Sequence, residues 1–540
     1  MIAQPADQIF GRYAGPAWAR WSAAAAFGAA EEAYRAGDRD AAARQCLGII
    51  LREPAHCDAR HLLGVIALRQ GRPADAAHWL GRAARLQPDI AGIHLHHGNA
   101  LLDLERLEEA AASFHRAAIL DPANPEPWNN LGNALKGLGR HDDALAAYGR
   151  ALAAQPGHAP TLYNLGRLLA DLGRFDEATE SLRAAIDSAG PDTDTARLGD
   201  CYVELGRVLA EQRRYDEALA VMRAMQEIDQ SGRAEWHQSL VLLAQGNYAE
   251  GWAKYERRYA MADREPPHQA ARAIDAGSVS GRRVLVCGEQ GHGDTIQFAR
   301  YVPLLAAAGA TVTLSVYPEL KPLLAGIDGA AAVIAPGDPE PHFDLATALP
   351  SLPLAFHTEV ATIPAAVPYL RAPAARLANW RERLGPRREP RVALCWRGSQ
   401  HIPQRSIPVA VLAPMLARRD VEFHAVQHEA PEDDRAWLAE NASVRMHGDD
   451  LADFADTAAL LDQMDLVVTI DTAVAHLAGA LAKPVWVMLP YSADWRWLID
   501  RDDSPWYPSA RLFRQQRPRD WHGVVDAVDR ALAEYPFAAA

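Results

Sequence analysis

The chain has 540 residues, of which 49% are hydrophobic and 23% charged, and this length allows about three to four domains. The composition is that of folded globular protein, and it excludes a disordered, collagen-like or disulfide-scaffold chain. With 55 basic and 69 acidic residues, the net charge of −14 argues against binding to nucleic acid through bulk charge. Five scattered cysteines and the lack of a long apolar run predict a cytoplasmic protein without a membrane span or a zinc site.

A repeat of 34 residues runs through the first half of the chain. Small residues and prolines recur in register, at Ala42, Ala76, Ala110, Ala144 and Ala178, at Gly64, Gly98, Gly132 and Gly166, and at Pro54, Pro88, Pro122 and Pro156. Each unit carries two apolar stripes at helical spacing, which predicts two helices that cross closely at the small residues and stop near the proline. The expected units are 23–56, 57–90, 91–124, 125–158, 159–198 and 199–232, with a loop insertion at 188–199 and a degenerate seventh unit at 233–260.

The unit that begins near Trp128, with Leu131, Gly132 and Tyr148, resembles the tetratricopeptide repeat. The resemblance implies an N-terminal superhelix over 23–260 with a long concave face. The array either binds a polypeptide partner or substrate or serves only as a scaffold. Asparagines recur on the first helix of successive units, at Asn99, Asn130, Asn133 and Asn164. These amides are candidates for holding an extended peptide by its backbone, and helix capping or solvation is the alternative.

Three histidines, His94, His96 and His97, lie close together in one predicted helix. Their density is that of a metal site, but a single short helix does not present all three to one ion. Ordinary surface and core positions are therefore the favoured interpretation.

From residue 282 the pattern changes to strands that alternate with helices. Residues 261–281 lose the helical period and carry Pro, Gly and Ser, which predicts a linker. Strands are expected at 283–287, 311–317, 332–335, 391–399, 421–427, 465–470 and 484–489, and helices at 295–309, 318–325, 408–418, 431–440, 472–482 and 520–534. This order predicts two Rossmann-like halves, 282–375 and 390–535, with ligands at the carboxyl ends of their strands.

The loop GEQGHGDT, residues 288–295, follows the first of these strands and opens a helix. It lacks the third glycine of the dinucleotide fingerprint, which argues against a nicotinamide or flavin cofactor. Its glycines permit close approach of the backbone to a ligand. Asp294 is either the cap of the following helix or a general base that faces a cleft.

Two further segments carry candidate phosphate ligands. Asp471 ends a strand and Thr472, Ala473 and His476 open a helix, whose free N–H groups favour a diphosphate. A capped helix with a buried histidine is the alternative. Ser399 ends another strand, and Arg405 precedes a helix, where it is either a phosphate ligand or a solvated charge.

Taken together, the segment from 282 to 535 resembles glycosyltransferase family 9, the heptosyltransferase-like group of the GT-B fold. The resemblance rests on the segments 291–294, 471–476 and 482–485 and on the basic residue Arg405. The segment 494–515 and the loop around Asp294 are more similar to the members that are fused to tetratricopeptide repeats.

This resemblance implies a nucleotide-diphosphate sugar donor bound by the C-terminal half, an acceptor at the N-terminal half, and no metal or other cofactor. It assigns the catalytic base to Asp294 and the acceptor side to Gly291, His292 and Gly293. The donor phosphates fall to Ser399, Arg405, Asp471, Thr472, Ala473 and His476. Two positions depart from the family pattern, since Ala473 replaces a glycine and Arg405 stands where a lysine is usual.

The fold expected is therefore α plus α/β, a repeat superhelix followed by a GT-B-type pair of Rossmann-like domains. The function expected is a metal-independent glycosyltransferase whose repeats present a protein or glycan acceptor. The alternative is a non-catalytic adaptor with a degenerate nucleotide-sugar domain. The aromatic residues Trp495, Trp497, Trp506 and Tyr507 suit either stacking on a ligand or packing between the halves.

Overall fold

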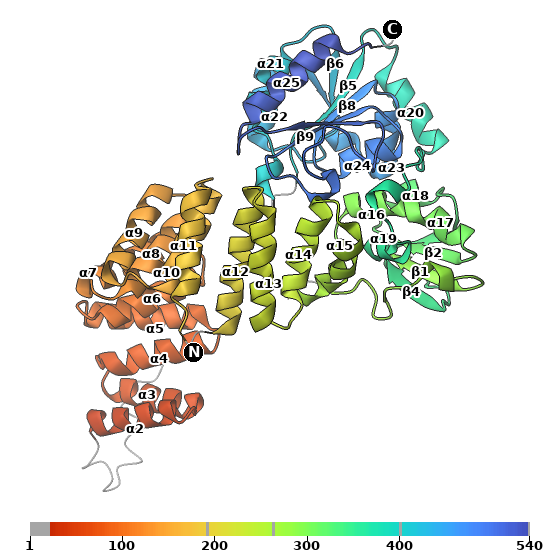
Figure 1. Cartoon of the computed structure of the whole chain (residues 1–540). Coiled ribbons are helices and arrows are strands. Elements are labelled where there is room, and N and C mark those ends of the chain that lie inside the picture. The colour runs from red at the N-terminus through yellow and green to blue at the C-terminus, as the bar shows by residue number, and fades with distance from the viewer. Residues whose placement is uncertain (1–21, 191–193, 262–264, 399–401, 538–540) are drawn as a thin grey trace, which may run out of the picture. The chain divides into compact units, whose positions relative to one another are not determined.

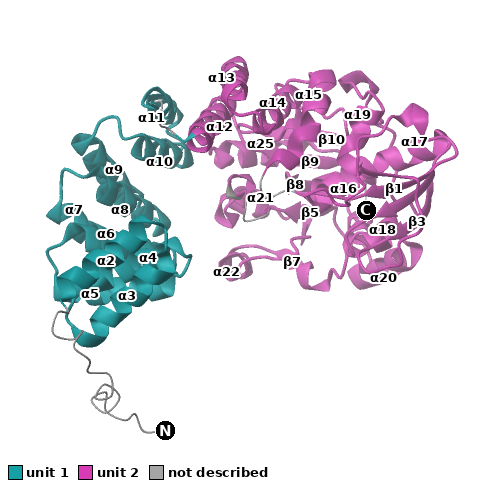
Figure 2. Cartoon of the chain, turned by 90° about the horizontal axis from the view of Figure 1, so that it is seen from below, with its two compact units in different colours: residues 1–194 teal, residues 195–540 magenta. Residues whose placement is uncertain are grey.

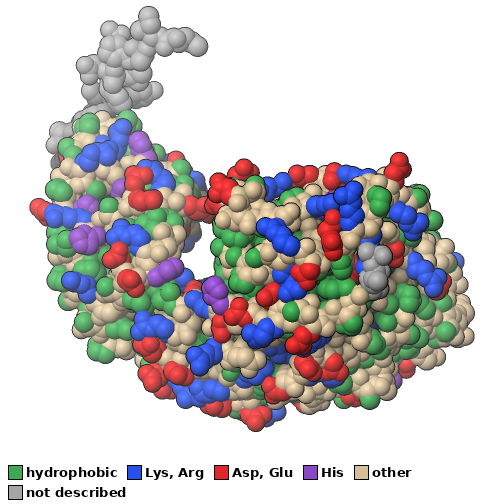
Figure 3. Space-filling model, turned by 90° about the horizontal axis from the view of Figure 1, so that it is seen from above, with side chains coloured by type: hydrophobic (Ala, Val, Ile, Leu, Met, Phe, Trp, Pro, Cys, Tyr) green, Lys and Arg blue, Asp and Glu red, His purple; other side chains and the backbone are tan. Residues whose placement is uncertain are grey.

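The computed structural model describes residues 22–190, 194–261, 265–398 and 402–537. The chain forms two compact units, residues 1–194 and 195–540 (Figure 2). Basic and acidic side chains are interspersed over the face seen in Figure 3. Of the helices in the described ranges, none combines the length and the apolar character that crossing a bilayer requires.

The first unit is a row of helical pairs (Figure 1). The pairs are α2 (Ala23–Arg35) with α3 (Arg39–Arg52), α4 (Cys57–Arg69) with α5 (Pro73–Leu86), α6 (Ala91–Leu102) with α7 (Leu107–Leu120), α8 (Pro125–Gly137) with α9 (His141–Ala154), and α10 (Ala159–Asp171) with α11 (Phe175–Asp187). The first helices α4, α6, α8 and α10 pack on one another along the row. The predicted two-helix repeat is thus confirmed.

The periodic glycines allow the two helices of each pair to meet. Each glycine faces the side chain 16 residues later, in the pairs Gly64 and Leu80, Gly98 and Phe114, Gly132 and Tyr148, Gly166 and Leu182, and Gly206 and Met222. A Cβ atom at these glycines would lie between 2.3 and 2.7 Å from the partner side chain. The repeat therefore requires glycine here for space, and the large partner fills the volume that the missing side chain leaves.

The second unit begins with two more helical pairs, α12 (Thr195–Glu211) with α13 (Tyr215–Ile228) and α14 (Arg233–Ala244) with α15 (Tyr248–Tyr255). The insertion expected as a loop at 188–199 is partly helical, because α12 already begins at Thr195. Residues 191–193, which belong to the same expected loop, lie outside the described residues.

Two parallel sheets follow (Figure 1). The first has the order β3-β2-β1-β4, with β1 (Arg283–Cys287), β2 (Thr311–Ser315), β3 (Ala330–Ile334) and β4 (Leu345–Ala348). In register, Val284 of β1 lies between Val312 and Leu345. The accompanying helices are α16 (His292–Phe298), α17 (Val302–Ala307), α18 (Lys321–Leu324) and α19 (Leu352–Ala355).

The second sheet has six parallel strands in the order β10-β9-β8-β5-β6-β7. They are β5 (Arg391–Cys395), β6 (Glu422–Ala425), β7 (Val444–Met446), β8 (Leu466–Ile470), β9 (Val485–Leu489) and β10 (Ala510–Arg514). The helices are α20 (Ala374–Leu384), α21 (Ala413–Leu416), α22 (Glu432–Asn441), α23 (Phe454–Asp462), α24 (Ala473–Ala480) and α25 (Trp521–Glu534). The chain builds outward from β5 in one direction and from β8 in the other, so the strand order reverses between these two strands.

The sequence prediction missed several of these elements. The strands β4, β7 and β10 and the helices α20 and α23 were not expected, and the helix expected at 408–418 is mostly 3₁₀ turns with only α21 helical. The missed strands lie at or beside the edges of the sheets and have at most five residues, too few to show a period. The broader prediction, helical repeats followed by a parallel-sheet α/β region, is confirmed.

The last helical pair is part of the α/β core. The Trp252 ring centroid lies 5.2 Å from that of Trp495 and 6.1 Å from that of Phe298. The Tyr248 hydroxyl accepts a hydrogen bond of 3.1 Å from Trp506 Nε1. The linker expected at 261–281 therefore does not separate two independent cores, and the compact units divide at residue 194 instead. The physical reason is that Tyr248 and Trp252, before the linker, are buried by contacts with aromatic residues that follow it.

We predict opposite effects of alanine at two glycines of one repeat. Gly132→Ala should lower the free energy of unfolding by about 1–3 kcal/mol, because its Cβ would collide with the Tyr148 ring. Gly149→Ala, in the same helical pair, has open space around its Cβ and should raise it by about 0.5–1 kcal/mol through helix propensity. Chemical denaturation followed by circular dichroism measures both, and equal effects would contradict the packing explanation.

Candidate functional site

A cavity of about 1350 Å³ lies at the carboxyl ends of the strands in the second unit. It opens beside the reversal between β5 and β8, which is where open α/β sheets bind their ligands. Its wall includes Arg397, Gln427, Asp471 and Thr472 from loops of the second sheet and Gly291 and His292 from the first. Both sheets thus contribute to one cavity that is large enough for a nucleotide with an attached group.

The helices α16 and α24 meet at their N-terminal turns. A Cβ at Gly293 would lie 2.9 Å from His476 Cδ2 and 3.4 Å from the Cα of Ala473. Gly293, predicted on the acceptor side, therefore serves the close packing of two helices. Ala473 is the small residue opposite it and also lines the cavity.

Five charged side chains form an alternating chain that reaches the cavity wall at Arg405 and Asp471. Asp294 of α16 pairs with Arg496, and Arg496 Nη1 lies 2.7 Å from Asp494 Oδ1. Asp494 Oδ2 lies 3.0 Å from Arg405 Nη2, and Arg405 Nη1 lies 3.1 Å from Asp471 Oδ2. This chain connects the loops of the first sheet to those of the second through three carboxylates and two guanidiniums.

Burial and the two arginines act against one another on these carboxylates. Burial raises the pKa of Asp294, with Arg496 opposing it, and raises the pKa of Asp471, with Arg405 opposing it. Burial acts in the same direction on Asp494, but Arg496 and Arg405 together lower the pKa of that carboxyl to about 2. Asp494 is therefore the fixed negative charge of the chain, while the two outer carboxylates are the more basic ones.

Asp294, the predicted general base, lies at the edge of the cavity. One of its oxygens, Oδ1, accepts a hydrogen bond from Arg496. Its other oxygen, Oδ2, lies 3.3 Å from the position of a Cβ on Gly291, a residue of the cavity wall. The side chain keeps 18% of its surface exposed and adjoins the cavity through Gly291, although it is not itself one of the wall residues.

Arg405 and Thr472, predicted to bind phosphate, both lie on the cavity wall. Thr472 makes no capping bond to the first turn of α24, and its hydroxyl lies 3.3 Å from that of Thr469. The helix therefore presents its first N–H groups at the wall, through Ala473 and Val474. Arg405 is held between Asp471 and Asp494, so two carboxylates already balance its charge.

His476 lies elsewhere than the sequence prediction places it. It is buried behind the wall, with Nδ1 at 3.0 Å from the Tyr507 hydroxyl and its ring stacked on Trp497 at 5.5 Å. Burial, with Arg496 next in importance, lowers the pKa of His476 well below its usual value, so the ring is neutral. The family resemblance assigned both Thr472 and His476 to the donor phosphates, but the packing of α16 on α24 covers the histidine.

His292 and Ser399 are the remaining residues of the predicted site. His292 lines the cavity and packs between Tyr317 and Phe454, with ring centroids 5.0 Å away on either side. Ser399 lies outside the described residues.

Sequence reasoning missed Arg496 and Asp494, the centre of the charge chain. Both lie in the stretch Asp494-Trp495-Arg496-Trp497, of which only the aromatic residues were interpreted from the sequence. The alternation of charged residues with tryptophans could have indicated a buried ion pair, because charges between buried tryptophans are themselves buried. The aromatic residues Trp495, Trp497, Trp506 and Tyr507 are all buried. Trp495 and Trp506 pack against Phe298 of the first sheet's helices, and Trp497 and Tyr507 pack against His476.

In the first unit, amide side chains form a ladder along the first helices of three repeats. Asn164 Nδ2 donates to Asn129 Oδ1, Asn129 Nδ2 to Asn130 Oδ1, and Asn130 Nδ2 to Asn99 Oδ1, each at 3.0 Å. Asn129 was not predicted, whereas the predicted Asn133 accepts a bond of 2.8 Å from the Tyr148 hydroxyl instead. Each ladder amide keeps a second N–H and a second lone pair for another partner.

The three neighbouring histidines separate in the structure. His96 contacts His61 at 2.8 Å, His97 contacts the Ser113 hydroxyl at 3.2 Å, and His94 contacts the Pro88 carbonyl at 2.9 Å. In the described part of the chain, no group of three metal-ligating side chains comes together.

Family models match both parts of the chain. Models described as tetratricopeptide repeats match residues 27–91, 98–139, 129–194 and 163–233. The model described as glycosyltransferase family 9 (heptosyltransferase) matches residues 450–518, which include Asp471, Thr472, His476 and the segment with Arg496. The chain therefore carries tetratricopeptide repeats across its N-terminal region and a glycosyltransferase family 9 domain towards its C-terminus.

A curated relative is protein FlbA of Caulobacter vibrioides, which is 28% identical over 347 residues, 58% of this chain and 57% of the relative. The match thus spans little more than half of the relative's length. Among solved structures, MamA is 23% identical, with a TM-score of 0.29 over 29% of this chain and 93% of that one. YrrB, described as a tetratricopeptide protein with an unusual peptide-binding site, is 23% identical, with a TM-score of 0.29 over 32% and 88%.

We predict that two carboxylates of the charge chain affect stability differently. Asp494→Asn should lower the free energy of unfolding by about 2–3 kcal/mol at pH 7, because an ionised group that pairs with both Arg496 and Arg405 is lost. Because Arg496 and Arg405 lower the pKa of folded Asp494 to about 2, below that of an exposed aspartate, this contribution is full at neutral pH and is lost as the pH falls towards 2.

Asp294→Asn is the matched comparison. Burial raises the pKa of Asp294, so its ionised form costs stability at pH 7, and the amide should be neutral or stabilising. Chemical denaturation followed by tryptophan fluorescence measures both variants. A larger loss from Asp294→Asn than from Asp494→Asn would contradict the assignment of charges.

Proposed function

We propose that the chain is a metal-independent glycosyltransferase. It moves a sugar from a nucleotide-diphosphate sugar to a polypeptide or glycan acceptor that the repeats present. The observation that carries this proposal is the cavity of about 1350 Å³, which has an uncapped helix start and Arg405 on one side and a buried carboxylate, Asp294, at its edge. In this proposal the two sheets with their helices, 282–375 and 390–535, form a GT-B pair.

The donor diphosphate would bind at the start of α24. The N–H groups of Ala473 and Val474 and the Thr472 hydroxyl can donate to phosphate oxygens, and the helix dipole favours their negative charge. Arg405 supplies a cation on the same wall. These groups stabilise the diphosphate as the bond from the sugar carbon to the phosphate oxygen breaks, which is the role that a metal plays in other enzymes.

Asp294 would accept the proton of the acceptor hydroxyl as the new bond from oxygen to the sugar carbon forms. Its raised pKa makes it a stronger base than an exposed aspartate. Arg496 holds Oδ1, which leaves Oδ2 directed to the side of Gly291 and the cavity. Arg496 is therefore a positioning residue for the base.

The amide ladder of the repeats would bind the acceptor polypeptide. An extended backbone alternates N–H and C=O groups, and each of Asn99, Asn130 and Asn164 can match it with a donor and an acceptor. Such contacts do not depend on the side chains of the ligand, so they suit an enzyme that modifies several positions along one polypeptide.

The donor prediction is tested by isothermal titration with a panel of nucleoside diphosphates and nucleosides. One diphosphate should bind, and Arg405→Ala should weaken it by about 1.5–3 kcal/mol while leaving the nucleoside unaffected. Arg419→Ala, which removes an exposed cation of the same half, is the control. If wild-type protein binds none of these ligands, the adaptor function replaces the transferase.

The base prediction is tested by turnover. Asp294→Asn keeps the oxygen that accepts from Arg496 but cannot take a proton, so transfer should fall by about 10²–10⁴-fold with donor affinity unchanged. Asp328→Asn, an exposed carboxylate of the same half, should keep wild-type turnover. Wild-type turnover in Asp294→Asn would remove Asp294 from the mechanism.

The acceptor prediction concerns the middle of the ladder. Asn130→Ala breaks contacts to both neighbours and should raise KM for a polypeptide acceptor by about tenfold, the scale of one or two hydrogen bonds, without changing donor affinity. Asn124→Ala, outside the ladder, is the control. An unchanged KM would separate the repeats from acceptor binding.

A further inference from the structure

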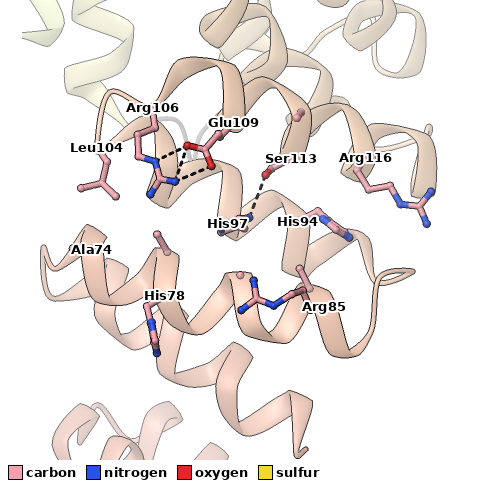
Figure 4. Close-up of a pocket in the computed structure, with 14 residues that line it drawn as sticks. Ala74, His78, Arg85, His94, His97, Leu104, Arg106, Glu109, Ser113 and Arg116 are labelled. Carbon is pink, nitrogen blue, oxygen red and sulfur yellow. Dashed lines mark hydrogen bonds and ion pairs between the residues drawn. The ribbon is translucent and has the colours of Figure 1, made fainter.

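A second cavity lies within the repeats, and its lining residues include none of the ladder asparagines. It has a volume of about 700 Å³ and lies between α5 and α7 (Figure 4). Alanines and Gly81 form much of its wall. Six basic or imidazole side chains surround it, namely His78, Arg85, His94, His97, Arg106 and Arg116, against a single carboxylate, Glu109.

The cavity exists because this repeat departs from its own pattern. His94 and His97 stand 34 residues before Trp128 and Leu131, which are buried core residues of the next repeat. There the Trp128 ring fills the corresponding space, with Arg150 5.0 Å above it. Two imidazoles in place of a tryptophan and a leucine give up apolar burial, and they leave a polar hollow where the neighbouring repeat is filled.

Most of the cations at this cavity are already paired. Arg106 forms a double hydrogen bond with Glu109, and Arg116 pairs with Asp89 at 2.7 Å. Arg85 has no hydrogen-bond or ion-pair partner among the residues that the structure describes. The cavity therefore contains one uncompensated guanidinium.

His97 presents a second donor beside Arg85. Its Nδ1 lies 3.2 Å from the Ser113 hydroxyl, and when that hydroxyl donates, Nε2 carries the proton. His97 Nε2 and Arg85 Nη1 lie 3.1 and 3.9 Å from one point, the position of a Cβ on Gly81. Figure 4 shows both side chains directed into the same space. Burial, with His94 and other cations adding to it, lowers the pKa of His97 and keeps the ring neutral.

We propose that this cavity binds an acidic peptide segment, with one carboxylate held between Arg85 and His97. The two donors match the two oxygens of one carboxylate, and one free positive charge matches its single negative charge. A phosphate would call for more donors than remain unpaired here. The volume exceeds that of one side chain, and the alanine wall suits the apolar parts of a bound peptide. The site is independent of the transfer chemistry.

The test uses the full chain and a fluorescein-labelled, blocked eight-residue peptide in which Glu alternates with Ala. Fluorescence anisotropy should show saturable binding of this peptide and at least tenfold weaker binding of the counterpart with Gln in place of Glu. Arg85→Ala should weaken binding at least tenfold, whereas Arg82→Ala, an exposed cation on the same helix and outside the cavity, should not.

His97→Leu restores the residue that the next repeat has at this position. It should raise the melting temperature by filling the cavity and should also abolish binding, so the loss cannot be attributed to unfolding. Equal affinity for the Glu and Gln peptides, or unchanged affinity in Arg85→Ala, would overturn the proposal. Displacement of the peptide by inorganic phosphate at lower concentrations than by acetate would overturn it in favour of a phosphate ligand.

Discussion

The alternating chain of Asp294, Arg496, Asp494, Arg405 and Asp471 is the interaction on which the second unit depends. Each charge is largely withdrawn from water, and loss of the central Asp494 would leave Arg496 and Arg405 without the carboxylate that they share. The same chain sets the chemistry of the cavity. It fixes a negative charge at Asp494, keeps Asp294 comparatively basic, and holds Arg405 beside the open start of α24. Stability and the proposed catalysis therefore draw on one set of side chains.

The repeats follow a simpler rule, in which a glycine on one helix faces a large side chain on the next. Where a repeat keeps its apolar residues, as at Trp128 and Leu131, the space between helices is filled. Where it replaces them by His94 and His97, a polar cavity remains. A departure from the repeat at buried positions therefore points to a functional site, because the polar residues lower the stability that apolar residues would provide there.

The unit boundary shows how burial overrides sequence composition. The Pro- and Gly-containing stretch 261–281 has the composition of a linker, yet Tyr248, Trp252 and Tyr255 before it pack against Phe298, Trp495 and Trp506 after it. The last helical pair is consequently a layer of the α/β core. The helices before the linker therefore cannot be separated from the α/β region at residues 261–281 without exposing large aromatic surfaces.

Sequence alone determined the two-helix repeat, the parallel sheets and the positions of Asp294, Arg405 and Thr472 at strand or helix ends, because periodicity and strand–turn–helix order are local properties. Tertiary structure decided everything that depends on neighbours distant in the chain. It buried His476 against Tyr507, made Gly293 a point of close contact between two helices, and placed Arg496 between two aspartates. The short edge strands β4, β7 and β10 likewise depend on the inner strands with which they pair, which are β1, β6 and β9 respectively. Which charges meet is set by the packing of α16 on α24, and no spacing within the sequence encodes that contact.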